Sequence, residues 1–281
     1  MSLHSGDALT RREANAVMAS APTTLVVLAG AASVGKTTLL SVLYEQYLRG
    51  GFAEYLFAGS LTLKGFEDRC HLSRLASWQA TPDTERTQRG TGSMMLHLRL
   101  ANRLMEPIDV LFTDIAGEEF DAVRDFPTEA SVADIVRRAD HFAVALDSTE
   151  LVNPYLRHAA RANTRQLMRS GAEHGLLSRA TGIQVVATKW DVIDVDERDS
   201  VREFLDQIRT DVVEVMPSVS ADVSLHITAS RRATDGSIKE GHGFEALLKE
   251  WLRVGSEKDI NRDLYLSGSD LRPFDSFKAN K

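Results

Sequence analysis

A chain of 281 residues with 43% hydrophobic and 26% charged residues can bury a large core, in one domain or two smaller ones. Its net charge of −7 and pI near 5.7 argue against a nucleic-acid-binding surface, so we expect no DNA or RNA partner. The single cysteine, Cys70, is typical of a reducing compartment, and no stretch approaches the ~18 apolar residues of a membrane span, so we expect a cytoplasmic protein without direct membrane insertion.

The first part of the chain contains its most specific motif. Residues 1–23 are mainly polar, and we expect a flexible leader there, with a weakly helical patch near residues 11–19. Residues 25–28 form an apolar run that predicts a buried strand. The pattern G-x-x-x-x-G-K-[ST] follows, matched at every fixed position, and then a helix with apolar residues at i, i+3 and i+4 spacing. This order is typical of a phosphate-binding loop.

Each fixed residue of that loop has a physical task. Glycines let successive backbone N–H groups point at an anion, and the amino end of the helix adds a partial positive charge. We expect Lys36 to reach the β- and γ-phosphates and the Thr37 hydroxyl to ligate Mg²⁺. The alternative is a Gly-rich turn that merely carries a lysine. The nucleotide-binding residues expected here are Gly30, Ala31, Ser33, Val34, Gly35, Lys36, Thr37 and Thr38.

Alternating strands and helices follow along the rest of the chain. Strands are expected at residues 93–100, 108–112, 141–146, 183–187 and 223–227, with residues 54–58 allowing a further one, and helices at 66–76, 128–139, 154–169, from Ser200 onward and at 244–252. Asn153 is expected to be the N-cap of the helix at 154–169, with Pro154 in its first position, and Ser200 and Glu203 are expected to form a capping box. The order predicts an α/β fold with a largely parallel sheet and helices on both faces. We expect one domain at residues 24–255, with an insertion at about 52–80, and a tail at 256–281.

A second motif, D-x-x-G, stands at residues 114–117, directly after an expected strand. Carboxylates at strand ends face the crevice where ligands bind in such folds. Asp114 is expected to hold Mg²⁺ through water, and the Gly117 N–H to sense a γ-phosphate. The segment 118–127 is expected to be a loop that orders or loosens with nucleotide state. The alternative is an aspartate that only caps a turn.

The third motif, Thr188-Lys189-Trp190-Asp191, indicates which base is bound. Guanine presents two adjacent N–H donors that one carboxylate, Asp191, accepts together, whereas adenine lacks that pair. Lys189 can lay its methylene stem over the purine, and Trp190 is expected to be a packing residue. The alternative is that Lys189 and Asp191 are solvated turn residues.

After the last expected strand, the backbone N–H of Ala229 is expected to meet the purine carbonyl, with Ser230 beside it. This signal is weak when it stands alone.

Together these residues resemble a known family. The segments GAASVGKT, DIAG, TKWD and ITAS occur in the order seen in Ras-like small GTPases of the translation-factor-related class. Within that class, three features are similar to those of bacterial double-GTPase families: the segment FAGSLTLKGFEDR, the pair Arg86-Thr87 and the segment DIAGEEF. The resemblance implies a P-loop NTPase three-layer sandwich with a mixed, six-stranded sheet, GTP or GDP and Mg²⁺ as ligands, and two switch segments. It also implies an effector or activating protein as partner, which could be a second GTPase.

The chain departs from the family pattern at three positions. Thr188 stands where asparagine is commoner, and a hydroxyl can make a similar local hydrogen bond. Ser230 replaces a lysine, which weakens base stacking. Glu118 stands where many relatives have the glutamine that orients the attacking water, and a carboxylate there is repelled by the γ-phosphate.

The sequence offers two candidates for the threonine of the first switch. The switch threonine that binds Mg²⁺ is either Thr87 or Thr91, and we favour Thr87. Arg86 and Arg89 lie beside them, as does the arginine finger of heterotrimeric G-protein alpha subunits; the alternative is two solvated loop arginines.

The first hypothesis is therefore a GTP-hydrolysing molecular switch, with Lys36, Thr87, Glu118 and Arg86 as its catalytic residues. A GTP-bound interaction module with little turnover is the second, and a P-loop ATPase or small-molecule kinase is the third.

Overall fold

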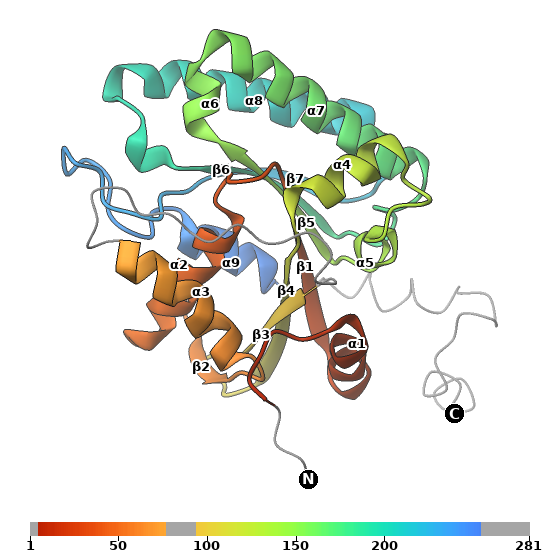
Figure 1. Ribbon diagram of the computed structural model, residues 1–281, viewed down its shortest axis with the longest axis vertical. Coiled ribbons are helices and arrows are strands. Elements are labelled where there is room, and N and C mark those ends of the chain that lie inside the picture. Colours follow the sequence, from red (N-terminus) through yellow and green to blue (C-terminus); the bar gives the residue numbers. More distant parts are fainter. Residues whose placement is uncertain (1–4, 77–93, 254–281) are drawn as a thin grey trace. The chain divides into compact units, whose positions relative to one another are not determined.

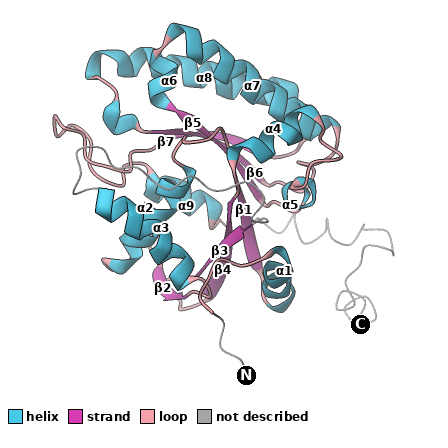
Figure 2. Ribbon diagram, in the orientation of Figure 1, coloured by secondary structure: helices cyan, strands magenta, loops and turns pink. Residues whose placement is uncertain are grey.

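The structure is a computed structural model that describes residues 5–76 and 94–253 (Figure 1). The chain divides into two compact units, Met1–Trp251 and Leu252–Lys281, and every element below belongs to the first. In chain order, as Figure 2 colours them by type, the elements are α1 (Arg11–Ser20), β1 (Thr23–Ala29), α2 (Lys36–Leu48), β2 (Leu56–Gly59), α3 (Leu63–Ala76), β3 (Met94–Ala101), β4 (Pro107–Asp114), α4 (Gly117–Asp125), α5 (Ala133–Arg137), β5 (His141–Asp147), α6 (Ser148–Val152), α7 (Pro154–Glu173), β6 (Gly182–Thr188), α8 (Arg198–Val215), β7 (Asp222–Ile227) and α9 (Phe244–Trp251).

The strands form one sheet in the order β2-β3-β4-β1-β5-β6-β7. Strands β4, β1, β5, β6 and β7 run parallel, whereas β3 pairs antiparallel with β4 and β2 antiparallel with β3. The predicted α/β class is confirmed. The number of strands is seven rather than the six that the resemblance implied, because the insertion after α2 contributes the short edge strand β2.

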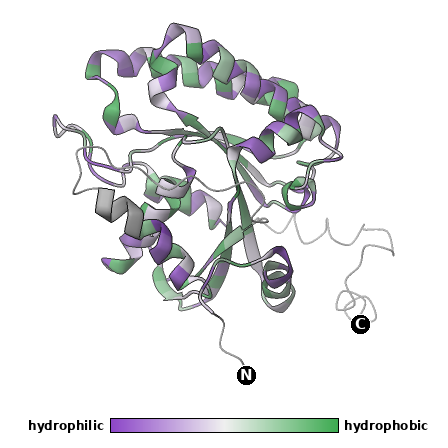
Figure 3. Cartoon of the chain, viewed as in Figure 1, coloured by the Kyte–Doolittle hydropathy of each residue, from purple (hydrophilic) through white to green (hydrophobic). Residues whose placement is uncertain are grey.

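Helices cover both faces of this sheet. Helices α2, α3 and α9 lie on one face, and α4, α6, α7 and α8 lie on the other, with α1 and α5 near the end of that second face (Figure 1). Strands β5 and β6 are buried along their whole length, which explains their continuous apolar runs. Figure 3 shows the same division, with hydrophobic residues along the strands and hydrophilic residues on the outer sides of the helices. No helix within the described residues is long and apolar enough to cross a membrane.

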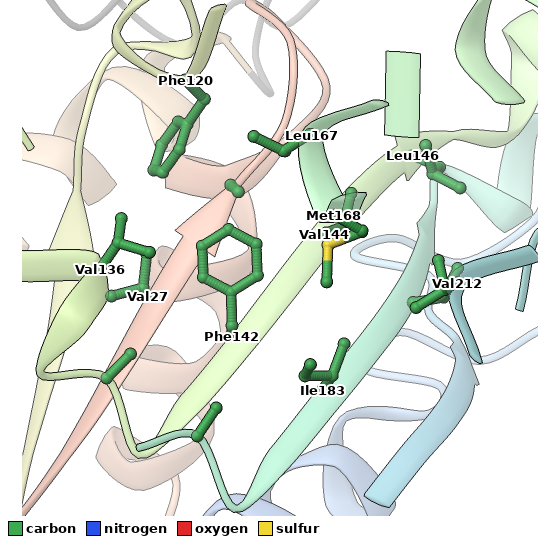
Figure 4. Packing of buried hydrophobic residues seen from close by; sticks show 14 of the residues in the cluster. Val27, Phe120, Val136, Phe142, Val144, Leu146, Leu167, Met168, Ile183 and Val212 are labelled. Atoms are coloured by element: carbon green, nitrogen blue, oxygen red, sulfur yellow. The ribbon is translucent and has the colours of Figure 1, made fainter. Parts of the chain in front are cut away.

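One part of the core joins α4 to β5. Phe120 of α4 lies against Phe142 of β5, with ring centroids 6.3 Å apart, and Leu167 and Met168 of α7 lie beside them (Figure 4). The sequence predicted a loop at residues 118–127, but α4 forms there because Phe120 and Val123, three residues apart, are buried on one side of a helix. The helix expected at 128–139 is correspondingly shorter, since only α5 is helical.

The sequence predicted the caps of two long helices, and one of these predictions is correct and the other is wrong. Asn153 caps α7 as predicted, and its side chain accepts a 2.9 Å hydrogen bond from the Tyr155 N–H, with Pro154 in the first turn. The capping box expected at Ser200 and Glu203 is wrong. A 3₁₀ turn at Val195–Glu197 leads directly into α8, so the helix already begins at Arg198.

The amino-terminal segment also differs from the expectation of a flexible leader. Ala8 and Leu9 are buried, and Leu9 forms two backbone hydrogen bonds with Met95 of β3, of 2.8 and 2.9 Å. Thr10 and Glu13 form a capping box that starts α1, and Ala14 is buried in the core. The sequence did not indicate this packing, because only a few apolar residues make the contact and the rest of the segment is polar.

We predict that Leu9→Ala lowers the free energy of unfolding by about 2–4 kcal/mol, because it removes a fully buried side chain. Leu104→Ala is the matched control: the same atoms are removed from a side chain that is 78% exposed, and the expected change is below about 0.5 kcal/mol. Urea denaturation followed by circular dichroism measures both. Equal effects for the two variants would show that the segment does not contribute to the core.

Candidate functional site

The carboxyl ends of four neighbouring parallel strands meet at one edge of the sheet. Residues 30–37 follow β1, Asp114 ends β4, Asp147 ends β5 and Thr188 ends β6. After β1 the chain continues to the side of the sheet that holds β2, β3 and β4, and after β4 it crosses to β5 on the other side of β1. Such a reversal of strand order is where open α/β sheets form a ligand-binding crevice.

The loop at residues 30–37 has the geometry of an anion site. Gly35, with φ of 97°, is the N-cap of α2, and no side chain caps the helix. A residue with a Cβ is strained at that φ, so glycine is required. The first N–H groups of α2 have no intrahelical partners, and they carry the positive end of the helix dipole. An anion with several oxygens, such as a phosphate chain, fits these donors.

Lys36 is folded back over this loop. Its side chain is buried, and Nζ donates to the carbonyl oxygens of Gly30 at 2.8 Å and Ala31 at 3.0 Å. Burial lowers the pKa of Lys36 to about 8, while the nearby Asp114 and Glu118 carboxylates act in the opposite direction. The loop therefore holds an ammonium group that is poorly solvated and is close to the helix terminus.

Two side chains whose oxygen atoms could bind a cation, Thr37 and Asp114, lie side by side next to the loop. Thr37 Oγ1 donates a 3.0 Å hydrogen bond to Oδ1 of Asp114, which is almost fully buried. The other oxygen, Oδ2, accepts from Nε of Arg69 in α3 at 2.5 Å. The sequence predicted that Thr37 and Asp114 both hold Mg²⁺, and the structure places the two side chains within hydrogen-bond distance. It did not predict Arg69.

The D-x-x-G motif contacts the loop directly. A Cβ on Gly117 would lie 2.5 Å from the Ala32 nitrogen and 2.8 Å from the Gly30 carbonyl oxygen, so only glycine fits at this position. Glu118 follows in the first turn of α4, is half-buried, and is close enough for its charge to act on Lys36. The loop and the start of α4 are therefore in direct contact.

Thr188 connects the loop to the third motif. Its buried hydroxyl lies 2.6 Å from the Val34 carbonyl oxygen and 3.0 Å from that of Leu146. Lys189, in the left-handed region with φ of 56°, directs Nζ to Oδ2 of Asp147 at 2.5 Å. Asp147 was not singled out from the sequence, although its place directly after a buried strand was the signal that could have found it.

Asp191 has a buried oxygen with no donor. Oδ1 of this carboxylate has no hydrogen-bond partner among the described residues, and burial raises the pKa of the group. An unpaired buried carboxylate oxygen is costly, so a ligand with N–H donors is favoured there. Guanine carries such donors. The residues present therefore fit that base.

The last motif differs from the prediction. The Ala229 N–H, expected to meet a purine carbonyl, instead donates to the His242 carbonyl oxygen at 3.1 Å, and Ala229 is fully buried. Ser230 follows it and is half-buried. Trp190 is a packing residue, as predicted: it is buried, with the Arg202 guanidinium 5.9 Å from its ring centroid.

The predicted first switch lies outside the described residues. Thr87, Thr91, Arg86 and Arg89 all fall within residues 77–93, so their roles stay predictions. Within residues 5–76 and 94–253, no three His, Cys, Asp or Glu side chains are grouped in a way that could hold a metal ion. A cation at Thr37 and Asp114 would therefore need ligand oxygens from a bound phosphate or from water.

A cavity of about 190 Å³ lies next to the loop. It is bounded by the loop at Val34, by α4 at Phe120 and Arg124, by Asp147 and by Leu167 of α7. Helix α4 thus has both a contact with the loop and open space beside it.

The central phosphate loop, with its lysine at the start of α2 and Asp114 on the adjacent strand, defines a P-loop nucleotide-binding protein. Within this class, the chain belongs to the Double-GTPase 2 family, whose sequence model matches residues 24–252. It is therefore a GTP-binding P-loop protein, and the predicted resemblance to double-GTPase families is confirmed.

The other comparisons add little. No curated protein matches the chain. Among solved structures, the bacterial selenocysteine-specific elongation factor EF-Sec is similar, with 13% identity and a TM-score of 0.39 over 86% of this chain. The match covers 29% of that structure, and it carries no functional argument.

We predict that guanine nucleotide binding takes up a proton at pH about 8.5. The pKa of Lys36 is lowered to about 8, so part of the population is neutral there, and bound phosphates favour the charged form. Affinity then falls as pH rises above about 8. Calorimetric titration with GDP in two buffers of different ionisation enthalpy measures the uptake, which shrinks toward pH about 7. Equal observed enthalpies in both buffers at pH about 8.5 would contradict this assignment.

Proposed function

We propose that the protein is a GTP-hydrolysing molecular switch that acts through nucleotide-dependent partner binding. The observation that carries the proposal is the convergence of the phosphate loop, Asp114 and Asp191 at the carboxyl edge of the sheet. Family membership supports the nucleotide, and the unpaired oxygen of Asp191 supports guanine as the base. A P-loop ATPase or kinase is disfavoured by the same two observations.

The residues beside the loop fit Mg²⁺. Thr37 donates its hydroxyl proton to Asp114, which leaves the lone pairs of Oγ1 for a cation. Asp114 provides a second hard oxygen nearby, and oxygen ligands are those that Mg²⁺ prefers. We propose that Thr37 and Asp114 hold the ion together with nucleotide phosphates, with Thr87 as a further ligand. Bound there, the ion supplies neutralisation of phosphate charge.

The chain's own groups then position the phosphates. Backbone N–H groups of residues 30–38 surround the chain of phosphate oxygens, and Lys36 exchanges its two loop carbonyls for the β- and γ-phosphates. In the reaction, a water oxygen forms a bond to the γ-phosphorus and the bond to the bridging oxygen breaks. The bridging oxygen leaves with the bonding electrons as a terminal oxygen of GDP, and the inorganic phosphate keeps both protons of the water. Arg86 is the proposed source of further positive charge at this step.

Turnover is expected to be slow without a partner. Glu118 lies near Lys36 at the place where a neutral, water-orienting side chain is commoner, and its negative charge opposes that of the γ-phosphate. An activating protein or a second GTPase would supply what the site lacks. This same observation favours a second candidate function, a GTP-bound interaction module that hardly turns over.

Loss of the γ-phosphate would change the position of α4. Gly117 contacts the loop, and α4 borders the cavity next to α7, so it has room to shift against that helix. We propose that partners read this shift together with the state of residues 81–92.

Asp191→Asn is predicted to weaken GTP binding by about 10- to 100-fold, since it replaces a charge-assisted pair of hydrogen bonds with a mismatched amide. Affinity for xanthosine triphosphate, which presents a carbonyl where guanine has an amino group, is expected to rise. Asp194→Asn is the matched control, because Asp194 is exposed three residues away. Competition against a fluorescent GDP analogue measures all three proteins. Unchanged GTP affinity in Asp191→Asn would refute the base assignment.

Glu118→Gln is expected to raise the single-turnover rate of GTP hydrolysis by about tenfold, because it removes a negative charge next to the γ-phosphate. Glu129→Gln, at an exposed position beyond α4, is expected to leave the rate unchanged. Release of phosphate is measured with and without cell lysate. If neither the wild type nor Glu118→Gln releases phosphate under either condition, the interaction module is the better description.

A further inference from the structure

Arg69 occupies a position that the proposed function does not use. Its Nε contacts Oδ2 of Asp114 at 2.5 Å, and its Nη1 donates to the Gly65 carbonyl oxygen at 2.8 Å. The arginine side chain is 19% exposed and that of Asp114 is 2% exposed, so the ion pair is largely shielded from water. With Thr37 on Oδ1, both oxygens of Asp114 are engaged.

Packing of α3 on α2 directs Arg69 toward this site. Phe66 is fully buried and stacks on Tyr44 of α2, with ring centroids 4.8 Å apart. Cys70, also fully buried, directs Sγ to the Ser41 carbonyl oxygen at 3.7 Å. Phe66, Arg69 and Cys70 are three and four residues apart, so they share one side of α3. Two apolar anchors thus hold the guanidinium over the first turn of α2.

Electrostatics makes Arg69 and a divalent cation competitors. A buried carboxylate requires a positive partner, because leaving it uncompensated costs several kcal/mol. Arg69 is that partner in the structure. A cation on Thr37 and next to Asp114 would supply the same compensation, and it would repel a guanidinium that stayed within a few ångströms. In addition to the nearby charge of Lys36, Asp114 therefore has either Arg69 or the cation as its counter-charge.

We infer that Arg69 is the counter-ion of Asp114 in the metal-free protein and that divalent cation binding displaces it, so that α3 responds to loading of the site. The inference rests on the proposed function, because it places a cation at Thr37 and Asp114. The end of α3 continues directly into residues 77–93, which contain the predicted switch threonine Thr87. Displacement of Arg69 therefore acts on the segment that leads into this switch.

Mn²⁺ affinity of the GDP complex, measured by electron paramagnetic resonance, tests the competition. Arg69→Ala is expected to bind Mn²⁺ about tenfold more tightly than the wild type, because the competing charge is gone. Arg69→Lys keeps a positive charge and is expected to stay near the wild-type affinity. Arg103→Ala removes an equal charge that is 77% exposed, in the hairpin at the other end of β4, and is expected to change nothing.

A second measurement uses the unaltered protein and does not depend on the folding of a variant. Hydrogen exchange of the α3 backbone in the GDP complex is expected to accelerate when Mn²⁺ is added, since one of the contacts that anchor α3 is lost. The amides of α8, which is not in contact with this site, serve as the internal reference.

The outcomes separate the inference from the proposed function. Equal or weaker Mn²⁺ binding in Arg69→Ala would overturn the inference alone, as would unchanged exchange in α3. Unchanged Mn²⁺ affinity together with slower GTP hydrolysis would instead make Arg69 a phosphate-contacting residue. A wild-type GDP complex that binds no Mn²⁺ would overturn the proposed cation site, and the inference with it.

Discussion

The site depends on one buried hydroxyl, that of Thr188. It contacts the Val34 carbonyl of the phosphate loop and the Leu146 carbonyl of β5, so one side chain fixes the ends of β1, β5 and β6 relative to one another. Loop carbonyls that are removed from water must find donors, and here the donor comes from the motif that is expected to recognise the base. The loop proposed to bind phosphate and the motif proposed to bind the base are thus joined by one side chain. Thr188 makes this contact through its hydroxyl, at a position where the resemblance implies that asparagine is commoner.

Around that connection, three charged side chains of the site have hydrogen-bond partners within the chain. Lys36 is hydrogen-bonded to its own loop, Asp114 is paired with Thr37 and Arg69, and Lys189 is paired with Asp147. Each of these contacts uses a group that a guanine nucleotide or its cation would also need. Binding is therefore an exchange of partners rather than an addition to an empty site, and the free energy gained is the difference between two sets of contacts.

Local patterns predicted the parts of the fold that depend on neighbours in sequence. The phosphate loop, the strand that ends at Asp114 and the cap at Asn153 were all found in this way, because spacing and residue type decide them. Contacts between distant segments were not predictable. Arg69 reaches Asp114 only because α3 packs on α2, and the Ala229 N–H is taken by His242 through a pairing that no pattern indicates. Leu9 packs on β3 for the same kind of reason.

Two partly buried carboxylates, Glu250 and Asp191, differ in whether all their oxygens have hydrogen-bond donors. Burial alone would raise the pKa of Glu250, but hydrogen bonds with His226, Gln184 and Ser224 lower it to about 2, and they fasten α9 to the sheet. Such a fully partnered carboxylate has a structural role that is complete without a ligand. Asp191 is the opposite case, because burial raises its pKa and one oxygen is left without a donor. An unpaired buried oxygen lowers stability, and the guanine proposed for this site would supply the missing donors.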